Sequence, residues 1–192
     1  MAVVGFMSKP RGSSNTNIEK ATSVDQLNGI KAKMWDNYVS LIIDEDKKVA
    51  DTIRLKDTAG ISYTIKNLSN RRYKLVVRYS FMDCDKCIKI LMSKIENYGN
   101  KNGFKDILVF TDAYDEHDFY VKVTNAKFKI PIYNLDYDRL GMFIENKNFP
   151  FLFILTPDLR VTKIFLPSKE LPDHIDEYLT YIQAYFKSVN QK

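Results

Sequence analysis

Apolar residues follow different spacings along the chain, and each spacing predicts a kind of secondary structure. Short, nearly continuous apolar runs are typical of buried strands, and apolar residues at intervals of three and four predict helices. From residue 74 onward strands and helices alternate, which predicts a central sheet with helices on its faces, the α/β class. Strands are predicted over 74–80, 106–111, 131–135, 151–156 and 160–166, and helices over 87–99, 115–124, 137–145 and 172–189. Gly99 is expected to end the first of these helices.

The first 73 residues carry a different pattern, with one helix and one hairpin. Apolar residues at helical spacing predict an amphipathic helix over 25–43. Two alternating segments, 52–56 and 61–65, flank the turn Asp57–Gly60 and predict a β-hairpin. We therefore divide the chain into a flexible lead-in or clipped anchor and one domain with an N-terminal extension. The boundaries are 1–23 for the lead-in, 24–192 for the domain, 74–189 for its core and 24–73 for the extension.

The composition is that of a soluble globular domain. Hydrophobic residues make up 45% and charged residues 28% of the 192 positions, and a chain of this length can bury a core without disulfides. Seven glycines argue against a Gly-rich nucleotide-binding loop, and two cysteines with two histidines exclude a module with several zinc ions. The net charge of +5 is dispersed along the chain. We therefore expect no nucleic-acid partner, because such a partner requires clustered basic residues.

The start of the chain leaves the cellular compartment open. The apolar run Ala2–Met7 is shorter than the apolar part of a signal peptide and much shorter than a membrane span. A polar stretch at 8–15, rich in residues that break regular structure, follows as a linker. The run fits either the end of a clipped signal or anchor, or the native start of a cytoplasmic protein. The residues themselves favour neither interpretation.

Two cysteines at one strand–helix junction are the clearest chemical feature. Cys84 and Cys87 form a CxxC pair where the predicted strand at 74–80 gives way to a helix. The unpaired N–H groups and the positive dipole end of a helix N-terminus stabilise a thiolate, the nucleophilic form of cysteine. Cys87, one helical turn further on, can attack the resulting mixed disulfide. The pattern predicts thiol–disulfide exchange in which Cys84 attacks and Cys87 resolves, with the pair itself as the redox centre and no cofactor.

Other uses of a cysteine pair fit the sequence less well. A zinc site needs two further ligands, and His117 and His174 are the only histidines. A copper-delivery role needs a longer cysteine spacing and a suitably placed histidine. A static structural disulfide or an inert thiol pair stays open as a further alternative.

Three features occur in a characteristic order: the strand Leu75–Ser80, the sequence Cys84-Asp85-Lys86-Cys87, and Phe149-Pro150 before the predicted strand at 151–156. Through them residues 74–189 resemble a thioredoxin-fold domain. In that family the proline ahead of a late strand is cis and faces the disulfide, which here implies a cis Pro150. The resemblance also implies a substrate groove beside Cys84, formed by Pro150 and Phe149. The backbone of Phe149 would pair with an extended partner segment, and its side chain would form an apolar wall.

The predicted hairpin extends the resemblance to one subfamily of the thioredoxin fold. Leu55–Gly60 contains a D-x-x-G pattern and is similar to the hairpin ahead of the CxxC strand in TlpA/ResA-type thiol–disulfide oxidoreductases, so that the resemblance covers 50–189. It implies a thioredoxin-like fold, a central mixed sheet flanked by helices and extended by an N-terminal helix and β-hairpin. It also implies protein disulfide or dithiol clients and an upstream redox partner. The implied location is exported, periplasmic or membrane-anchored through a tether upstream of this sequence, with a cytoplasmic location as the alternative.

The sequence departs from this family at the position of a buried acid. Arg78 stands where thioredoxin carries the acid that helps to deprotonate the resolving cysteine, and Asp83 stands where thioredoxins often have tryptophan. A peroxiredoxin is disfavoured, because the Pro-x-x-x-Thr-x-x-Cys arrangement is absent. The alternative function is a redox-inert thioredoxin-fold module that holds a protein partner in the Pro150 groove or on the N-terminal helix. The carboxylates that could replace the missing acid are Glu96, Asp112 and Asp115.

Overall fold

The chain forms two compact units, Met1–Val39 and Ser40–Lys192. The structure is a computed structural model that describes residues 15–80, 82–113, 115–135, 139–147 and 149–190. The described part of the first unit belongs to helix α1 (Asn15–Asp44), whose last five residues lie in the second unit. The predicted helix is therefore present. Its apolar residues Leu27, Ile30, Met34 and Tyr38 are each at least half exposed.

Helix α1 begins earlier than the sequence analysis expects. Residues 15–23 are helical rather than part of a flexible lead-in, and residues 1–14 lie outside the described part of the chain. The segment 15–28 contains neither proline nor glycine, so no residue in it interrupts the helix once it has formed. None of the helices in the described residues combines the length and the apolar character that crossing a membrane requires.

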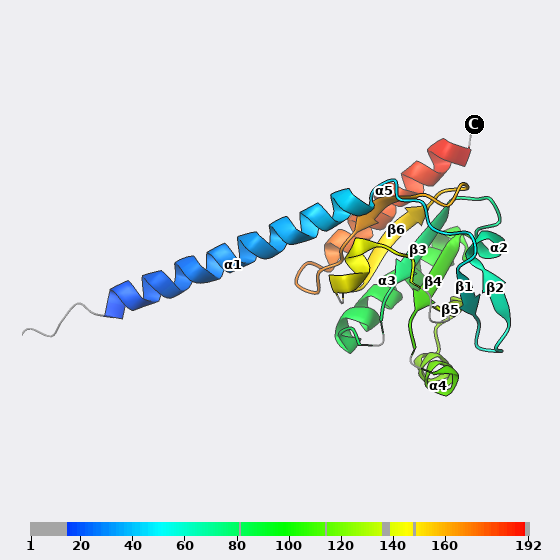
Figure 1. The fold of residues 1–192 in the computed structure, drawn as a ribbon, viewed down its shortest axis with the longest axis horizontal. Helices are drawn as coiled ribbons and strands as arrows, with labels where there is room; N and C mark the ends of the chain where they lie inside the picture. Colours follow the sequence, from blue (N-terminus) through cyan, green and yellow to red (C-terminus); the bar gives the residue numbers. More distant parts are fainter. Residues whose placement is uncertain (1–14, 81, 114, 136–138, 148, 191–192) are drawn as a thin grey trace, which may run out of the picture. The chain divides into compact units, whose positions relative to one another are not determined.

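The second unit is built on one mixed sheet of seven strands, in the order β2-β1-β5-β4-β3-β6-β7 (Figure 1). Strands β3, β4 and β5 are parallel to one another, whereas β1 with β2, β1 with β5, β3 with β6 and β6 with β7 are antiparallel. The predicted hairpin is therefore part of the central sheet. The strands are β1 (Arg54–Lys56), β2 (Ser62–Thr64), β3 (Lys74–Arg78), β4 (Ile107–Thr111), β5 (Ile132–Leu135), β6 (Phe151–Leu155) and β7 (Val161–Phe165).

Both faces of the sheet are covered, which explains the nearly continuous apolar runs in its central strands. Successive side chains of a strand point to opposite faces, so Leu75 joins a core with helices α3 and α5, while Val76 joins a second core on the other face. In the same way Leu152 belongs to the first core and Phe153 to the second. The helices of this unit are α2 (Ile65–Ser69), α3 (Asp85–Asn102), α4 (Glu116–Ala126), α5 (Asp173–Asn190) and the short 3₁₀ helix η1 (Phe143–Lys147).

Helix α3 ends later than the sequence analysis expects. Gly103, with φ of +87°, follows the last helical residue, and its N–H bonds to the carbonyl of Gly99 at 2.7 Å. Gly99 lies inside the helix, where a Cβ atom would come within 2.2 Å of the Phe104 ring. Gly99 therefore allows Phe104 to pack against α3, and Gly103 ends the helix.

Candidate functional site

A tight turn joins β3 to α3 and carries the cysteine pair. The backbone N–H of Asp83 donates to the carbonyl of Ser80 at 2.9 Å, and the N–H of Ser80 donates to Asp83 Oδ2 at 2.8 Å. The N–H of Met82 donates to the Ser80 hydroxyl at 3.1 Å. Ser80 and Asp83 thus each donate a backbone N–H to the other residue, which stabilises the turn. These bonds place Cys84 as the N-terminal cap residue of α3, in an extended conformation with φ of −61° and ψ of 114°.

The two thiols differ in exposure. Cys84 is exposed and Cys87 is half-buried, and both are free thiols. The carbonyl of Cys84 accepts the first helical bond, from the N–H of Ile88 at 3.0 Å. The arrangement matches the sequence prediction, with one thiol at the helix N-terminus and the second one turn further on.

The surroundings of the thiols shift their pKa values in opposite directions. The pKa of Cys84 is lowered, first by a hydrogen bond from the Cys87 side chain, then by the backbone N–H groups of Cys87 and Lys86 and the positive charge of Lys169. The pKa of Cys87 is raised, first by burial and then by its hydrogen bond to Cys84 and the negative charge there. The exposed thiol is therefore the one whose surroundings favour the thiolate, the nucleophilic form of cysteine.

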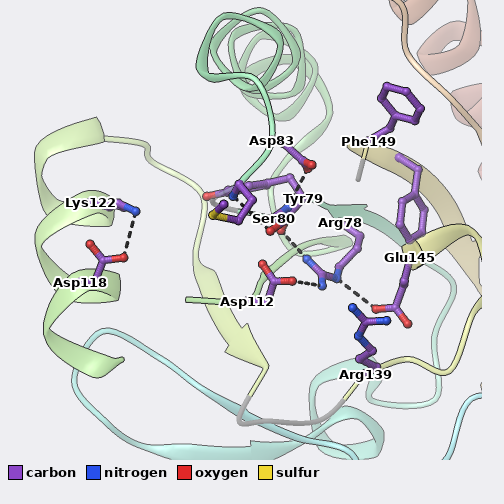
Figure 2. Close-up of a pocket in the computed structure, with 12 residues that line it drawn as sticks. Arg78, Tyr79, Ser80, Asp83, Asp112, Asp118, Lys122, Arg139, Glu145 and Phe149 are labelled. Atoms are coloured by element: carbon purple, nitrogen blue, oxygen red, sulfur yellow. Dashed lines mark hydrogen bonds and ion pairs between the residues drawn. The ribbon is translucent and has the colours of Figure 1, made fainter. Parts of the chain in front are cut away.

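A cavity of about 360 Å³ lies beside the turn (Figure 2). Its lining combines aromatic and apolar side chains with seven charged ones. They come from the end of β3, the turn after it, the residue that follows β4, α4, the segment before η1, η1 itself, and the segment at and just before the start of β6. The lining residues are Arg78, Tyr79, Ser80, Met82, Asp83, Asp112, Asp118, Lys122, Arg139, Glu145, Phe149 and Phe151. Asp83 directly precedes Cys84, so the cavity begins one residue from the exposed thiol.

Arg78 lies between two carboxylates in this cavity, as Figure 2 shows. Its Nη2 atom is 2.7 Å from Asp112 Oδ2 and its Nε atom is 3.3 Å from Glu145 Oε1. Nη1 donates to the carbonyl of Tyr79. The side chains of Arg78 and Glu145 are 5% and 1% exposed, whereas that of Asp112 is 35% exposed. Arg78 thus connects the ends of β3 and β4 to η1 in a largely buried ion network.

The three carboxylates that could replace the missing acid lie in different parts of the fold. Glu96 accepts the N–H of Lys129 at 2.6 Å, and Asp115 caps α4 by accepting the N–H of Asp118 at 2.7 Å. Among the three, Asp112 alone lines the cavity beside the cysteine turn.

The sequence analysis noted Asp83 only as a departure from thioredoxins and did not place it in a site, but Asp83 lines the cavity. It is 7% exposed, and its Oδ1 atom has no hydrogen-bond partner in the described protein. Burial raises the pKa of Asp83, while the hydrogen bond from Ser80 and the charge of Arg78 act in the opposite direction. Its place directly before a CxxC pair was the sequence signal that could have identified it.

The segment before β6 is held by two buried carboxylates. Asp44, at the end of α1, accepts the N–H groups of Phe143 and Ile144, each at 2.8 Å, and so caps η1. Glu145 accepts the N–H of Met142 at 3.2 Å through the oxygen that does not pair with Arg78. These contacts fix η1 on the sheet directly ahead of Phe149.

Phe149 and Pro150 lie at the start of β6. Phe149 is 54% exposed and lines the cavity, whereas Pro150 is buried. No peptide bond between described residues is cis, so the Phe149–Pro150 bond is trans, and the expectation of a cis proline is wrong. An X–Pro bond prefers the trans form by about 0.5–1 kcal/mol unless tertiary contacts reverse this preference. The place of a proline in the order of strands does not by itself determine its isomer.

The remaining candidates from the sequence lie apart from the cavity lining. His117 and His174 are exposed, and no group of three His, Cys, Asp or Glu side chains in the described ranges is arranged to hold a metal ion. Asp57 of the predicted hairpin turn accepts the N–H groups of Ala59 and Ile61, each at 2.9 Å. The D-x-x-G pattern is therefore a structural turn, completed by Gly60 with φ of +76°.

The chain is similar to known proteins in structure but not in sequence. No protein-family model matches the chain, and no curated protein matches it in sequence. In structure it is similar to the thioredoxin domain of a thiol-disulfide oxidoreductase from Bacteroides vulgatus (TM-score 0.51, 17% identity, 69% of this chain and 96% of that chain). It is also similar to a thiol:disulfide interchange protein from Bacteroides sp. (TM-score 0.50, 19% identity, 69% and 89%).

A third similar structure comes from another branch of thiol chemistry. Peroxidoxin BcpB from Mycobacterium tuberculosis matches with a TM-score of 0.54 at 13% identity, over 74% of this chain and 97% of that chain. At such identities the likeness concerns the fold. The predicted mixed sheet, the flanking helices, the N-terminal helix and the hairpin are all present. The chain therefore has the thioredoxin-like fold that its sequence predicts, with the CxxC pair at the junction of β3 and α3.

Proposed function

We propose that the protein is a thiol–disulfide oxidoreductase whose redox centre is the pair Cys84 and Cys87. The observation that carries this proposal is the opposite shift of the two thiols: the exposed Cys84 has a lowered pKa and the half-buried Cys87 a raised one. A nucleophile must be ionised and accessible, whereas a resolving thiol can wait protonated until the mixed disulfide has formed. The thioredoxin-like fold and similar structures that are thiol–disulfide oxidoreductases support the proposal.

The exchange takes place in two displacements. The Cys84 thiolate attacks one sulfur of a client disulfide, a new S–S bond forms, and the other client sulfur leaves as a thiolate. Formation of the mixed disulfide removes the negative charge on Cys84 that raises the pKa of Cys87. Cys87 then loses its proton to solvent or to the departing thiolate and attacks Cys84 Sγ, and the second client sulfur leaves. Two electrons pass from the protein to the client, and the reverse sequence oxidises a client dithiol.

Phe149 and Pro150 are proposed as the substrate groove. Phe149 offers a half-exposed aromatic surface at the rim of the cavity. Pro150 is buried and, because its ring fixes φ, it holds the backbone of this segment in one conformation. The clients are proposed to be proteins that carry a disulfide or dithiol, with an upstream partner that resets the pair. We further propose an exported or periplasmic location.

The test uses the reduced full chain and the neutral hydroxyethyl disulfide. We expect the wild-type protein to form the Cys84–Cys87 disulfide and to release two equivalents of thiol. Cys87→Ala should stop at a mixed disulfide with one equivalent, and Cys84→Ala should not react at a comparable rate. Exchange that persists in Cys84→Ala overturns the assignment of roles. A reduction potential below about −300 mV would instead indicate a structural disulfide, since working exchangers lie between about −120 and −270 mV.

A further inference from the structure

We propose that the cavity beside Cys84 binds a basic side chain, lysine or arginine, that lies next to the reacting cysteine of a client. The proposal rests on the proposed function and names the class of client that the site selects. The cavity lies one residue from the exposed thiol, and its chemistry is not needed for the exchange of sulfur atoms itself.

Carboxylates outnumber cations around the buried Arg78 in the lining of the cavity. Arg78 is the buried cation of its lining, and it is surrounded by the carboxylates Asp83, Asp112 and Glu145. The other two lining cations have partners of their own. Lys122 pairs with Asp118 at 2.9 Å, and Arg139 donates to Asn146 Oδ1 at 2.7 Å. A second positive charge in the cavity would therefore offset the surplus of buried negative charge.

Two carboxylate oxygens of lining residues lack a hydrogen-bond donor among the residues that the structure describes. Asp83 Oδ1 and Asp112 Oδ1 are both buried, and neither has a hydrogen-bond partner within the described protein. Buried acceptors are satisfied in the great majority of proteins, so each orphaned one calls for a donor. An ammonium group brings three N–H donors and a guanidinium five, and bonds between such groups and carboxylates are about twice as strong as neutral ones.

The walls of the cavity suit the stem of a long basic side chain. Tyr79, Met82, Phe149 and Phe151 give the lining apolar surface, and lysine and arginine pack their methylene stems on such surfaces while the charged head finds polar partners. Asp83 and Cys84 are consecutive, so their Cα atoms are about 3.8 Å apart. A client residue beside the reacting cysteine would thus lie next to Asp83, which lines the cavity.

Long-range attraction would not produce the same preference. The protein carries a net charge of +5, so its overall field repels a basic peptide and attracts an acidic one. A faster reaction with basic clients would have to come from local contacts. Because the long-range field and the proposed local contacts favour peptides of opposite charge, a faster reaction with basic peptides would report on the contacts in the cavity.

The test compares peptides that carry the same disulfide and differ in the residue next to the reacting cysteine, which is lysine, acetyl-lysine, norleucine or glutamate. We expect the wild-type protein to reduce the lysine peptide at least about 10-fold faster than the other three, the effect of one charge-assisted bond. In Asp83→Asn the ratio of lysine to norleucine rates should fall toward one. The matched control Asp158→Asn, on an exposed carboxylate paired with Arg160, should keep the wild-type ratio.

The outcomes separate this inference from the proposed function. Equal rates for all four peptides, or a faster reaction with the glutamate peptide, overturn the basic-client site even if hydroxyethyl disulfide is reduced normally. Failure to reduce hydroxyethyl disulfide overturns the proposed function instead. The comparison of lysine with acetyl-lysine uses the wild-type protein, so it decides the question even if Asp83→Asn does not fold. A ratio unchanged in folded Asp83→Asn also contradicts the assignment.

Discussion

Replacing Arg78 with methionine would test whether the buried ion network holds the site together. Methionine has a long apolar side chain, so Arg78→Met removes the charge while leaving most of the volume filled. The change takes the cationic partner away from Glu145 and Asp112 and the donor away from the carbonyl of Tyr79. We expect the second unit to lose stability through the carboxylates that stay behind.

The magnitude follows from the exposure of the two carboxylates. Removing one partner of a buried ion pair costs about 3–5 kcal/mol, because a buried charge is left without compensation. Glu145, whose side chain is 1% exposed, meets this condition, whereas that of Asp112, at 35%, can still be reached by water. We therefore expect a loss in the lower part of that range, about 3–4 kcal/mol. For a protein of this size, such a loss corresponds to a fall in Tm of about 6–16 °C.

The assay is urea unfolding followed by circular dichroism at neutral pH. Tryptophan fluorescence is less suitable, because the single tryptophan, Trp35, lies on α1 in the first unit and is 67% exposed. Arg160→Met is the matched control. The Arg160 side chain is 42% exposed and pairs with Asp46 and Asp158, and exposed pairs contribute about 0–1 kcal/mol each.

A double variant provides the sharper test. Glu145→Gln in the Arg78→Met background removes the uncompensated charge and keeps an acceptor for the N–H of Met142. It should therefore restore about 1–3 kcal/mol of the loss. A double variant no more stable than Arg78→Met, or an Arg78→Met loss no greater than that of Arg160→Met, would refute the reasoning.

Three further predictions concern individual groups of the site. In Cys87→Ala the pH midpoint for alkylation of Cys84 should rise, because the side-chain hydrogen bond that contributes most to its lowered pKa is lost. Cys87→Ser should retain much of the lowered pKa. Rates of reaction with iodoacetamide against pH measure both midpoints, and equal midpoints in the two variants would contradict the assignment. Asp44→Asn leaves at least one of the two N–H groups of η1 that Asp44 caps without an acceptor, so it should lower the free energy of unfolding in urea by about 1–3 kcal/mol. The control Asp46→Asn lies on an exposed residue whose φ of 63° asparagine tolerates, and it should cost less than about 1 kcal/mol. Equal losses in the two variants would disprove the cap. Burial raises the pKa of Asp83 in the folded protein, so the folded state holds this proton more tightly than the unfolded chain. The stability contributed by the protonated form is therefore lost as pH rises from about 4 through the raised pKa. Asp83→Asn should gain stability relative to wild type over this pH interval, and a stability difference independent of pH would contradict the burial argument.

Local patterns in the sequence determined most of the fold. The apolar runs of the central strands are continuous because both faces of the sheet are buried, as the split of Leu75 and Val76 between two cores shows. The position of Cys84 at the start of α3 follows from a strand and a helix that are joined by a short connection. The D-x-x-G hairpin is set by Asp57, whose partners lie within six residues. Short-range geometry of this kind can be recognised in a single sequence.

Features that depend on distant residues were visible only in the folded protein. Arg78 stands at a position that suggested a lost acid, but its partners are 34 and 67 residues away, at Asp112 and Glu145. Gly99 resembled a helix end, and it is instead the place where the Phe104 ring packs against α3. The Phe149–Pro150 bond has the trans form that X–Pro bonds prefer, so the place of Pro150 in the order of strands did not predict its isomer. The sequence therefore determined the fold and the place of the cysteine pair. The order of strands in the sheet decided which charges lie near that pair, because the sheet brings together residues that the chain keeps far apart.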